Sequence, residues 1–198
     1  MLRAGVVVLL LLAASSTASM SGQVENNRYL DPMGEFSVEV PQILDLNITD
    51  GENPEFSWVD FVTGKGYWMF PTGAFTLEWY RDWPHGTDLT SNTELFYRTT
   101  ESLLPEYLKN NMQPRGSFEK VSGRREFIGD YPAYRFVARG ELDGLSAVRA
   151  GAWILLEDRL AIASMVKRIE DDQLDRPPES LIPWESLDRF CASVQRLK

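Results

Sequence analysis

The residues that could support nucleophilic or metal chemistry are few in this 198-residue chain. His85 is its only histidine and Cys191 its only cysteine. A serine or cysteine nucleophile needs a base beside it, but His85 lies between Pro84 and Gly86 in a sequence typical of a turn. Cys191 falls on the apolar stripe of a predicted helix, where a buried packing role is expected. One histidine and one cysteine do not build a zinc site of the Cys/His type, so we predict no catalytic nucleophile and no metal site.

Known phosphate-binding and calcium-binding loops are not recognisable in the sequence. Neither a Walker-type loop nor the G-x-G-x-x-G pattern occurs, and Gly64-Lys65-Gly66 is an isolated fragment typical of a turn. Asp171, Asp172 and Asp175 do not have the spacing of a calcium loop. We therefore predict no cofactor. The 29 acidic residues still allow two carboxyl groups to meet in a cleft, so a carboxylate-based hydrolase remains an alternative.

The most unusual part of the sequence is the aromatic-rich stretch from Gly66 to Gly86. It contains seven of the 23 aromatic residues of the chain. Trp79 and Tyr80 are adjacent, so in a strand their side chains point to opposite faces of the sheet. Either both faces are covered, or one aromatic side chain is exposed and belongs to a surface that binds a partner or an apolar ligand.

Two arginines follow on a later predicted strand. Arg135 and Arg139 are four residues apart, which places both on one face of a strand. They form either the solvated side of the sheet or a patch for an anion or an acidic partner. The candidate binding surface comprises Tyr67, Trp68, Trp79, Tyr80, Trp83, Arg135 and Arg139.

The composition limits the class of protein and its partners. With 43% hydrophobic and 25% charged residues, the chain is typical of a globular protein, and its length favours one domain. The formal net charge is −9. An acidic chain repels phosphate backbones and anionic membrane surfaces. We therefore predict no nucleic-acid partner.

The first 18 residues have the pattern of a secretory signal peptide. Arg3 supplies a positive charge, residues 5–14 form an apolar run, and Ala18 ends a small-residue cleavage motif. The run is shorter than the roughly 20 residues that span a bilayer. We predict cleavage after Ala18, no stable membrane span after this cleavage, and a secreted or periplasmic location. Asn47 begins an Asn-Ile-Thr sequon, which would carry a glycan only in a eukaryotic secretory pathway.

The order of the predicted elements indicates an α+β domain. A flexible leader over 19–33 precedes one domain over 34–198. In chain order we predict strands at 35–40, 66–70 and 74–80, a helix at 102–112, strands at 117–127, 134–140, 147–156 and 160–168, and a helix that begins at Pro183. Turn-forming residues predict a loop over 46–54. The links between the four later strands are too short for parallel crossovers, which favours an antiparallel meander with helices packed on it.

Several segments resemble the Mog1/PsbP-like family of domains. The phrase Phe36-Ser37-Val38-Glu39-Val40-Pro41 is similar to the family's opening strand, and Gly129-Asp130-Tyr131-Pro132-Ala133-Tyr134-Arg135-Phe136 to its central turn and strand. Residues 147–168 resemble the strand pair that follows. Phe190-Cys191-Ala192-Ser193 resembles the closing helix, with Val194 where a second aromatic residue is usual. The resemblance covers residues 36–194 and implies an α/β/α sandwich around a twisted antiparallel sheet.

The resemblance also bears on function. Members of the family are generally binding or assembly modules without a shared catalytic set: a photosystem extrinsic subunit, a regulator of a small nuclear GTPase, and exported bacterial proteins. We therefore predict an exported, non-enzymatic binding or assembly module with a protein partner in the cell envelope. The alternatives are the carboxylate-based hydrolase and a small-ligand carrier, which would need an enclosed apolar cavity near Trp68, Trp79 or Trp83.

Overall fold

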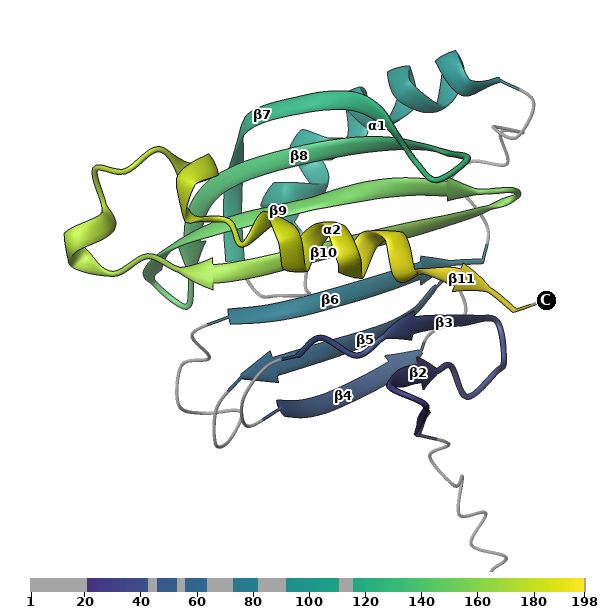
Figure 1. Cartoon of the computed structure of the whole chain (residues 1–198). Coiled ribbons are helices and arrows are strands. Elements are labelled where there is room, and N and C mark those ends of the chain that lie inside the picture. The colour runs from purple at the N-terminus through teal and green to yellow at the C-terminus, as the bar shows by residue number, and fades with distance from the viewer. Residues whose placement is uncertain are drawn as a thin grey trace, which may run out of the picture.

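The structure is a computed structural model that describes residues 21–42, 46–52, 56–63, 73–81, 92–110 and 116–197. In these residues, seven strands form one antiparallel sheet at the centre of the protein (Figure 1). Across this sheet the strands are, in order, β4 (Leu46–Glu52), β5 (Phe56–Thr63), β6 (Gly73–Tyr80), β10 (Arg159–Arg168), β9 (Leu145–Leu156), β8 (Tyr131–Leu142) and β7 (Gly116–Ile128). Each neighbouring pair is antiparallel.

A smaller antiparallel sheet packs against the large one. Its strands are, in order, β1 (Gln23–Glu25), β2 (Arg28–Leu30), β3 (Phe36–Glu39) and β11 (Gln195–Arg196). The predicted strand at 35–40 is confirmed, and Phe36, Val38 and Val40 are buried, as their alternation with polar residues predicts. Because β11 pairs with β3, the last strand of the chain closes a sheet built mainly by the first part of the domain.

Helices cover both faces of the large sheet (Figure 1). Helix α1 (Thr93–Asn110) packs on one face, against β7 and β8, and α2 (Trp184–Ser193) and the small sheet pack on the other. Each face has its own apolar core. Phe96 and Trp153 belong to the core under α1, and Trp79 belongs to the core under α2. This arrangement confirms the predicted fold class.

Strands β7 to β10 form the predicted meander. Their links are Gly129-Asp130, Asp143-Gly144 and Glu157-Asp158, the three pairs that the sequence predicted. Each link contains at least one residue with a positive φ angle, which is the backbone geometry of tight two-residue hairpins. Residues 160–167 of β10 then pair with β6, which joins the meander to the earlier strands.

Helix α1 is longer than the sequence predicted. It begins at Thr93 and not at Ser102. The side chain of Asn92 accepts a hydrogen bond from the backbone N–H of Leu95 at 3.0 Å and so caps the helix. Pro105 therefore lies in the interior of the helix and not in its first turn, and it removes one backbone hydrogen bond there. The predicted helix at the end of the chain is confirmed as α2, which begins at Trp184 with Pro183 at its N-cap position, one residue after the predicted start.

Strands also occur where the sequence predicted no regular structure. β1 and β2 occupy residues 23–30 of the predicted flexible leader, and their link, Asn26-Asn27, has two positive φ angles that suit a tight hairpin. β4 occupies most of the predicted loop at 46–54. Within the described residues β4 pairs only with β5, and such an edge strand tolerates the turn-forming residues that suggested a loop.

Some predictions fall on residues outside the described ranges. They are the signal peptide at 1–18 and the strand at 66–70; β6, the expected partner of that strand, pairs with β5 and β10. In the part of the chain that the structure describes, no helix combines the length and the apolar character needed to cross a bilayer.

Candidate functional site

The predicted aromatic surface is not present as a unit among the described residues. Tyr67, Trp68 and Trp83 lie outside these residues. Trp79 is buried under the small sheet and stacks on Phe36 at a centroid distance of 5.3 Å, so its assignment to a binding surface is wrong. Tyr80 points to the opposite face and is half-buried. Trp79 is enclosed because both faces of the sheet are covered, the first of the two arrangements that the sequence allowed.

Arg135 and Arg139 lie on one face of β8, as predicted, but both are bound by the protein itself. The buried guanidinium of Arg135 pairs with Glu126 at 2.6 Å and with Asp188 at 2.9 Å, and it lies over the ring of Trp184. Arg139 donates to a backbone carbonyl in the loop before α2. These contacts hold α2 and its preceding loop on the sheet. The two arginines therefore do not form a free basic patch.

Of His85 and Cys191, the two residues considered for nucleophilic chemistry, the structure describes only Cys191. His85 lies outside the described residues. Cys191 is buried in the core under α2, as predicted, and burial raises the pKa of its thiol to about 12. A thiol with such a pKa is a poor nucleophile. Across the described ranges, no group of three or more histidine, cysteine, aspartate or glutamate side chains is placed to hold a metal ion.

A buried polar cluster joins α1 to the centre of the sheet. Glu78 of β6 and Arg149 of β9 are fully buried, and Arg149 Nη2 lies 3.5 Å from Glu78 Oε1. The Tyr107 hydroxyl of α1 donates to Glu78 and accepts from Arg149, each at 2.7 Å. The Tyr80 hydroxyl donates to the second Glu78 oxygen at 2.8 Å. These hydrogen bonds compensate for the burial of two charges and fix α1 over β6 and β9.

Asp60 of β5 lies on the same face, close to Glu78. Burial raises the pKa of Asp60 to about 7; a hydrogen bond with Thr76 lowers it, and the Glu78 carboxylate raises it further. Two carboxyl groups thus lie near each other, as a carboxylate-based hydrolase requires. Asp60 and Glu78 are both buried on the face of the large sheet that carries α1. Both oxygens of the Glu78 carboxylate accept hydrogen bonds from tyrosine hydroxyls. This arrangement suits a structural role better than proton transfer to a substrate.

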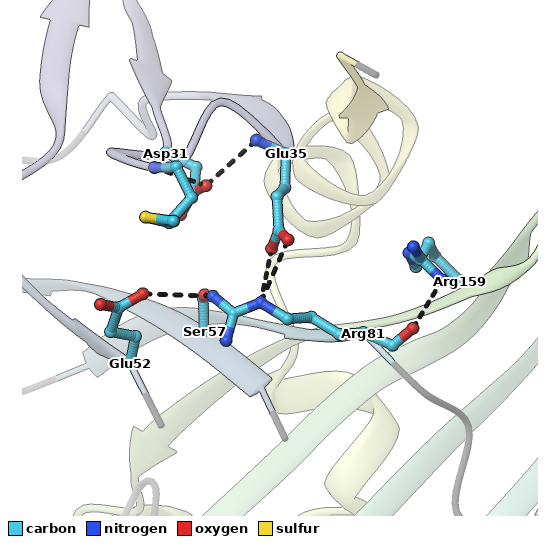
Figure 2. A network of polar contacts seen from close by, with 7 residues as sticks. Asp31, Glu35, Glu52, Ser57, Arg81 and Arg159 are labelled. Atoms are coloured by element: carbon cyan, nitrogen blue, oxygen red, sulfur yellow. Dashed lines mark hydrogen bonds and ion pairs between the residues drawn. The ribbon is translucent and has the colours of Figure 1, made fainter. Parts of the chain in front are cut away.

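One end of the large sheet carries a polar network centred on Arg81, directly after β6 (Figure 2). Arg81 Nε lies 3.0 Å from Glu35 Oε2, and Arg81 Nη2 lies 3.2 Å from Glu52 Oε2. Arg81 Nη2 also donates to Ser57 at 2.7 Å, and the Arg81 carbonyl accepts from Arg159 at 2.6 Å. Glu35 lies just before β3, so this network ties the small sheet to the large one.

The ion pairs continue along the same end toward the last strand. Arg159 lies 3.4 Å from Asp158, and Arg196 of β11 pairs with both Asp158 and Glu157. Glu157 and Asp158 form the link between β9 and β10. Glu157 has a φ angle of 54°, which residues other than glycine rarely adopt. Its ion pair with Arg196 holds the side chain of this strained residue against β11.

An open hollow of about 420 Å³, lined by both polar and apolar residues, lies beside these ion pairs. It is lined by Tyr131, Leu156, Glu157, Val194, Gln195, Arg196 and Leu197. Phe127, at the tip of the β7–β8 hairpin, is 63% exposed, and Tyr131 and Leu197 are exposed as well. We call the following group of residues the strand-end surface: Glu52, Arg81, Phe127, Asp130, Tyr131, Glu157, Asp158, Arg159, Arg196 and Leu197. An exposed aromatic side chain at the edge of a hollow, as Tyr131 is here, is typical of binding sites, so this surface is the candidate functional site.

The sequence did not predict the strand-end surface. Its residues come from β4, the end of β6, and the links and ends of β7 to β11, so only the folded topology brings them together. One local signal was available. The Gly129-Asp130 link predicted a hairpin, and a hairpin tip places Phe127 and Tyr131 at the same end of the sheet, although their side chains lie on opposite faces.

Comparison with known proteins identifies the fold. Neither a protein-family model nor a curated protein matches the sequence. Among solved structures, the Ran-binding protein Mog1p of Saccharomyces cerevisiae superimposes with a TM-score of 0.50 at 11% identity, over 91% of this chain and 97% of Mog1p. This chain has the Mog1/PsbP-like fold. The resemblance seen in the sequence is thereby confirmed at the level of the fold.

Two other solved structures are similar. A protein from Bacteroides thetaiotaomicron matches with a TM-score of 0.51 at 12% identity over 87% of this chain. The chain spans about half of that protein, 48% of its length. CyanoP, the cyanobacterial PsbP of Synechocystis, matches with a TM-score of 0.45 at 15% identity, over 94% of this chain and 98% of CyanoP. Function is argued below from the surface of this chain.

Proposed function

We propose that this protein is a non-enzymatic binding or assembly module of the cell envelope, and that it contacts a protein partner through the strand-end surface. The observation that carries the proposal is the exposure of apolar side chains at this end of the sheet: Tyr131 and Leu197 line the open hollow, and Phe127 is exposed on the other face of the same hairpin. Aromatic side chains have few rotatable bonds, bury a large area and dominate many protein interfaces. Exposing them to water has a cost that a bound partner removes.

The hairpin that presents these aromatic residues is well supported. Ile128 packs against the core under α2, and Tyr131 lies opposite it across the β7–β8 pair. Phe127 lies opposite Pro132, whose ring fixes the backbone φ angle after Tyr131. A rigid hairpin loses little conformational freedom when it binds. This favours a role in recognition over one as a mobile loop.

Two further observations support the proposal. Mog1p, which shares the fold, is a Ran-binding protein, so the fold accommodates a protein-binding role. Residues 1–18 have the pattern of a secretory signal peptide, which supports export to the envelope. Export of the mature chain as a secreted or periplasmic protein is part of this proposal.

The proposal is tested by the size of the native protein in envelope extracts. We expect the protein to elute from a gel-filtration column in a complex larger than the single chain. The double variant Phe127→Ser/Tyr131→Ser is expected to elute as the single chain, because it lacks both aromatic anchors but keeps the buried core.

The matched control is Leu174→Ser, which replaces an exposed apolar side chain in the loop before α2. This variant is expected to remain in the complex. The proposal is rejected if the wild-type protein elutes alone from every envelope extract, or if the double variant stays in the complex. Circular dichroism confirms that each variant is folded.

A further inference from the structure

In every ion pair of the strand-end surface the carboxylate is more exposed than the arginine. The side chain of Arg81 is 21% exposed and that of Glu52 is 56% exposed. For Arg196 and Glu157 the exposed fractions are 24% and 66%. The same order holds for Arg159 and Asp158. The arginines therefore lie beneath the carboxylates, and the outer layer of this surface is negative.

The β7–β8 link adds a further negative charge. Asp130 is exposed and precedes Tyr131 directly. Four exposed carboxylates, from Glu52, Asp130, Glu157 and Asp158, thus lie at the same end of the sheet as the hollow. Each carboxylate attracts a cation in water by only about 1 kcal/mol, but several that act on one partner favour cationic groups and repel anionic ones.

The hollow supplies a different kind of contact. Leu197 contributes exposed aliphatic surface and the Tyr131 ring an aromatic wall, with the buried Leu156 and Val194 beneath them. The volume of about 420 Å³ is large enough for one or two apolar side chains of a partner. Apolar contact in the hollow and negative charge around it would act on neighbouring residues of one bound segment.

We propose that the strand-end surface recognises a segment of a protein partner that carries lysine or arginine on both sides of an apolar side chain. The apolar side chain occupies the hollow, and the cations face Asp130, Glu157 and Asp158. This inference rests on the proposed function and names the chemistry of the partner. An anionic ligand does not fit this surface, because its arginines are already paired with more exposed carboxylates.

The inference is tested with two synthetic peptides and the full chain. The first has a Phe-Leu pair between flanking lysines, and the second has glutamates in place of the lysines. We expect the lysine peptide to bind, to shift the backbone NMR signals of Tyr131 and Leu197, and to bind more weakly as salt is added. Equal binding of the glutamate peptide, or signals that shift at a different surface, would overturn the inference.

A pair of charge-reversal variants sharpens the test. Asp130→Lys/Glu157→Lys alters the strand-end surface and leaves the ion pair between Asp158 and Arg196 in place. Glu119→Lys/Glu141→Lys changes the net charge equally, at exposed positions toward the other end of β7 and β8. The first variant is expected to weaken binding of the lysine peptide about tenfold, and the second by less than about twofold. Equal losses for the two variants would show that only the overall charge matters.

The outcomes also separate this inference from the proposed function. In envelope extracts, the native complex is expected to be lost in Asp130→Lys/Glu157→Lys, as in Phe127→Ser/Tyr131→Ser. If only the aromatic variant loses the complex, the surface binds a partner that is not basic, and this inference alone is wrong. If both variants keep the complex, the strand-end surface is not the contact, and both proposals fail.

Discussion

Burial raises the pKa of Asp60 to about 7, and the hydrogen bond with Thr76 offsets this only in part. The ordinary pKa of an aspartate is near 4. Between about pH 4 and pH 7 the folded protein therefore retains a proton that the unfolded chain has lost. Since the folded state binds more protons, the free energy of unfolding falls as the pH rises through this range. Above about pH 7 Asp60 is ionised in both states, and its protonation no longer stabilises the folded protein.

The variant Asp60→Asn removes this titration. We expect the stability of the wild type, relative to the variant, to fall by about 2 kcal/mol or more between about pH 4 and pH 8. Urea denaturation at several pH values measures the difference. Asp143→Asn, at an exposed link, is the control and should follow the wild-type profile. A constant difference between Asp60→Asn and wild type at all pH values would show that Asp60 has an ordinary pKa.

Arg135 and Arg139 share a face of β8 but differ in burial, and this difference predicts different effects on stability. Replacing Arg135 by methionine removes ion pairs to Glu126 and Asp188 and the contact with Trp184. We expect Arg135→Met to reduce the free energy of unfolding by about 2 kcal/mol and Arg139→Met by less than about 1 kcal/mol. Urea denaturation of both variants tests this prediction. Equal effects would contradict the assignment of Arg135 as the residue that holds α2.

At the scale of the elements, Arg81 is one of the polar links between the small sheet and the large one (Figure 2), and the Tyr29 hydroxyl, which donates to Asp50, is another. Replacing it by methionine releases Glu35 but leaves both apolar cores in place. We expect faster amide hydrogen exchange in β2 and β3. The increase should correspond to a loss of only about 1 kcal/mol of local stability, because the ion pairs of Arg81 are partly exposed. The control is Arg189→Met, which removes an exposed ion pair with Glu185. Unchanged exchange in β2 and β3 would contradict a linking role.

Elements with strong local signals were predictable from the sequence, and those that depend on distant partners were not. The meander was predictable because its links, such as Asp143-Gly144, have the composition of tight turns. The start of α1 was not, because Ser102 and Pro105 resemble a helix start while Asn92 provides the real cap. β4 forms because it pairs with β5. This strand was not predictable, because Asn47, Asp50 and Gly51 are residue types typical of loops.

At the scale of the whole molecule, the candidate site depends on topology. The antiparallel order of the large sheet brings the end of β6, the β7–β8 link and the β9–β10 link to one end, where β11 adds Arg196 and the next residue is Leu197. The prediction that Trp79 belongs to a binding surface was wrong, because aromatic content alone does not distinguish a covered face of a sheet from an exposed one. The fold class was predictable because it follows from the order of elements.

Export predicts a shorter mature protein. Cleavage after Ala18 removes the apolar run and leaves Ser19 as the first residue. Mass spectrometry of the protein purified from its native source should find this N-terminus, in a secreted or periplasmic fraction. An intact N-terminus on protein recovered from the cytoplasm would contradict the proposed location.

The central claim is that the strand-end surface contacts a protein partner. The most direct test places a photoreactive phenylalanine analogue at Phe127 and, in a second variant, at Glu185, an exposed position on α2. Illumination of intact cells is expected to give a discrete covalent adduct with one protein from position 127 and none from position 185. If position 127 gives no adduct, or if both positions give the same adducts, the strand-end surface is not the contact and the account is wrong.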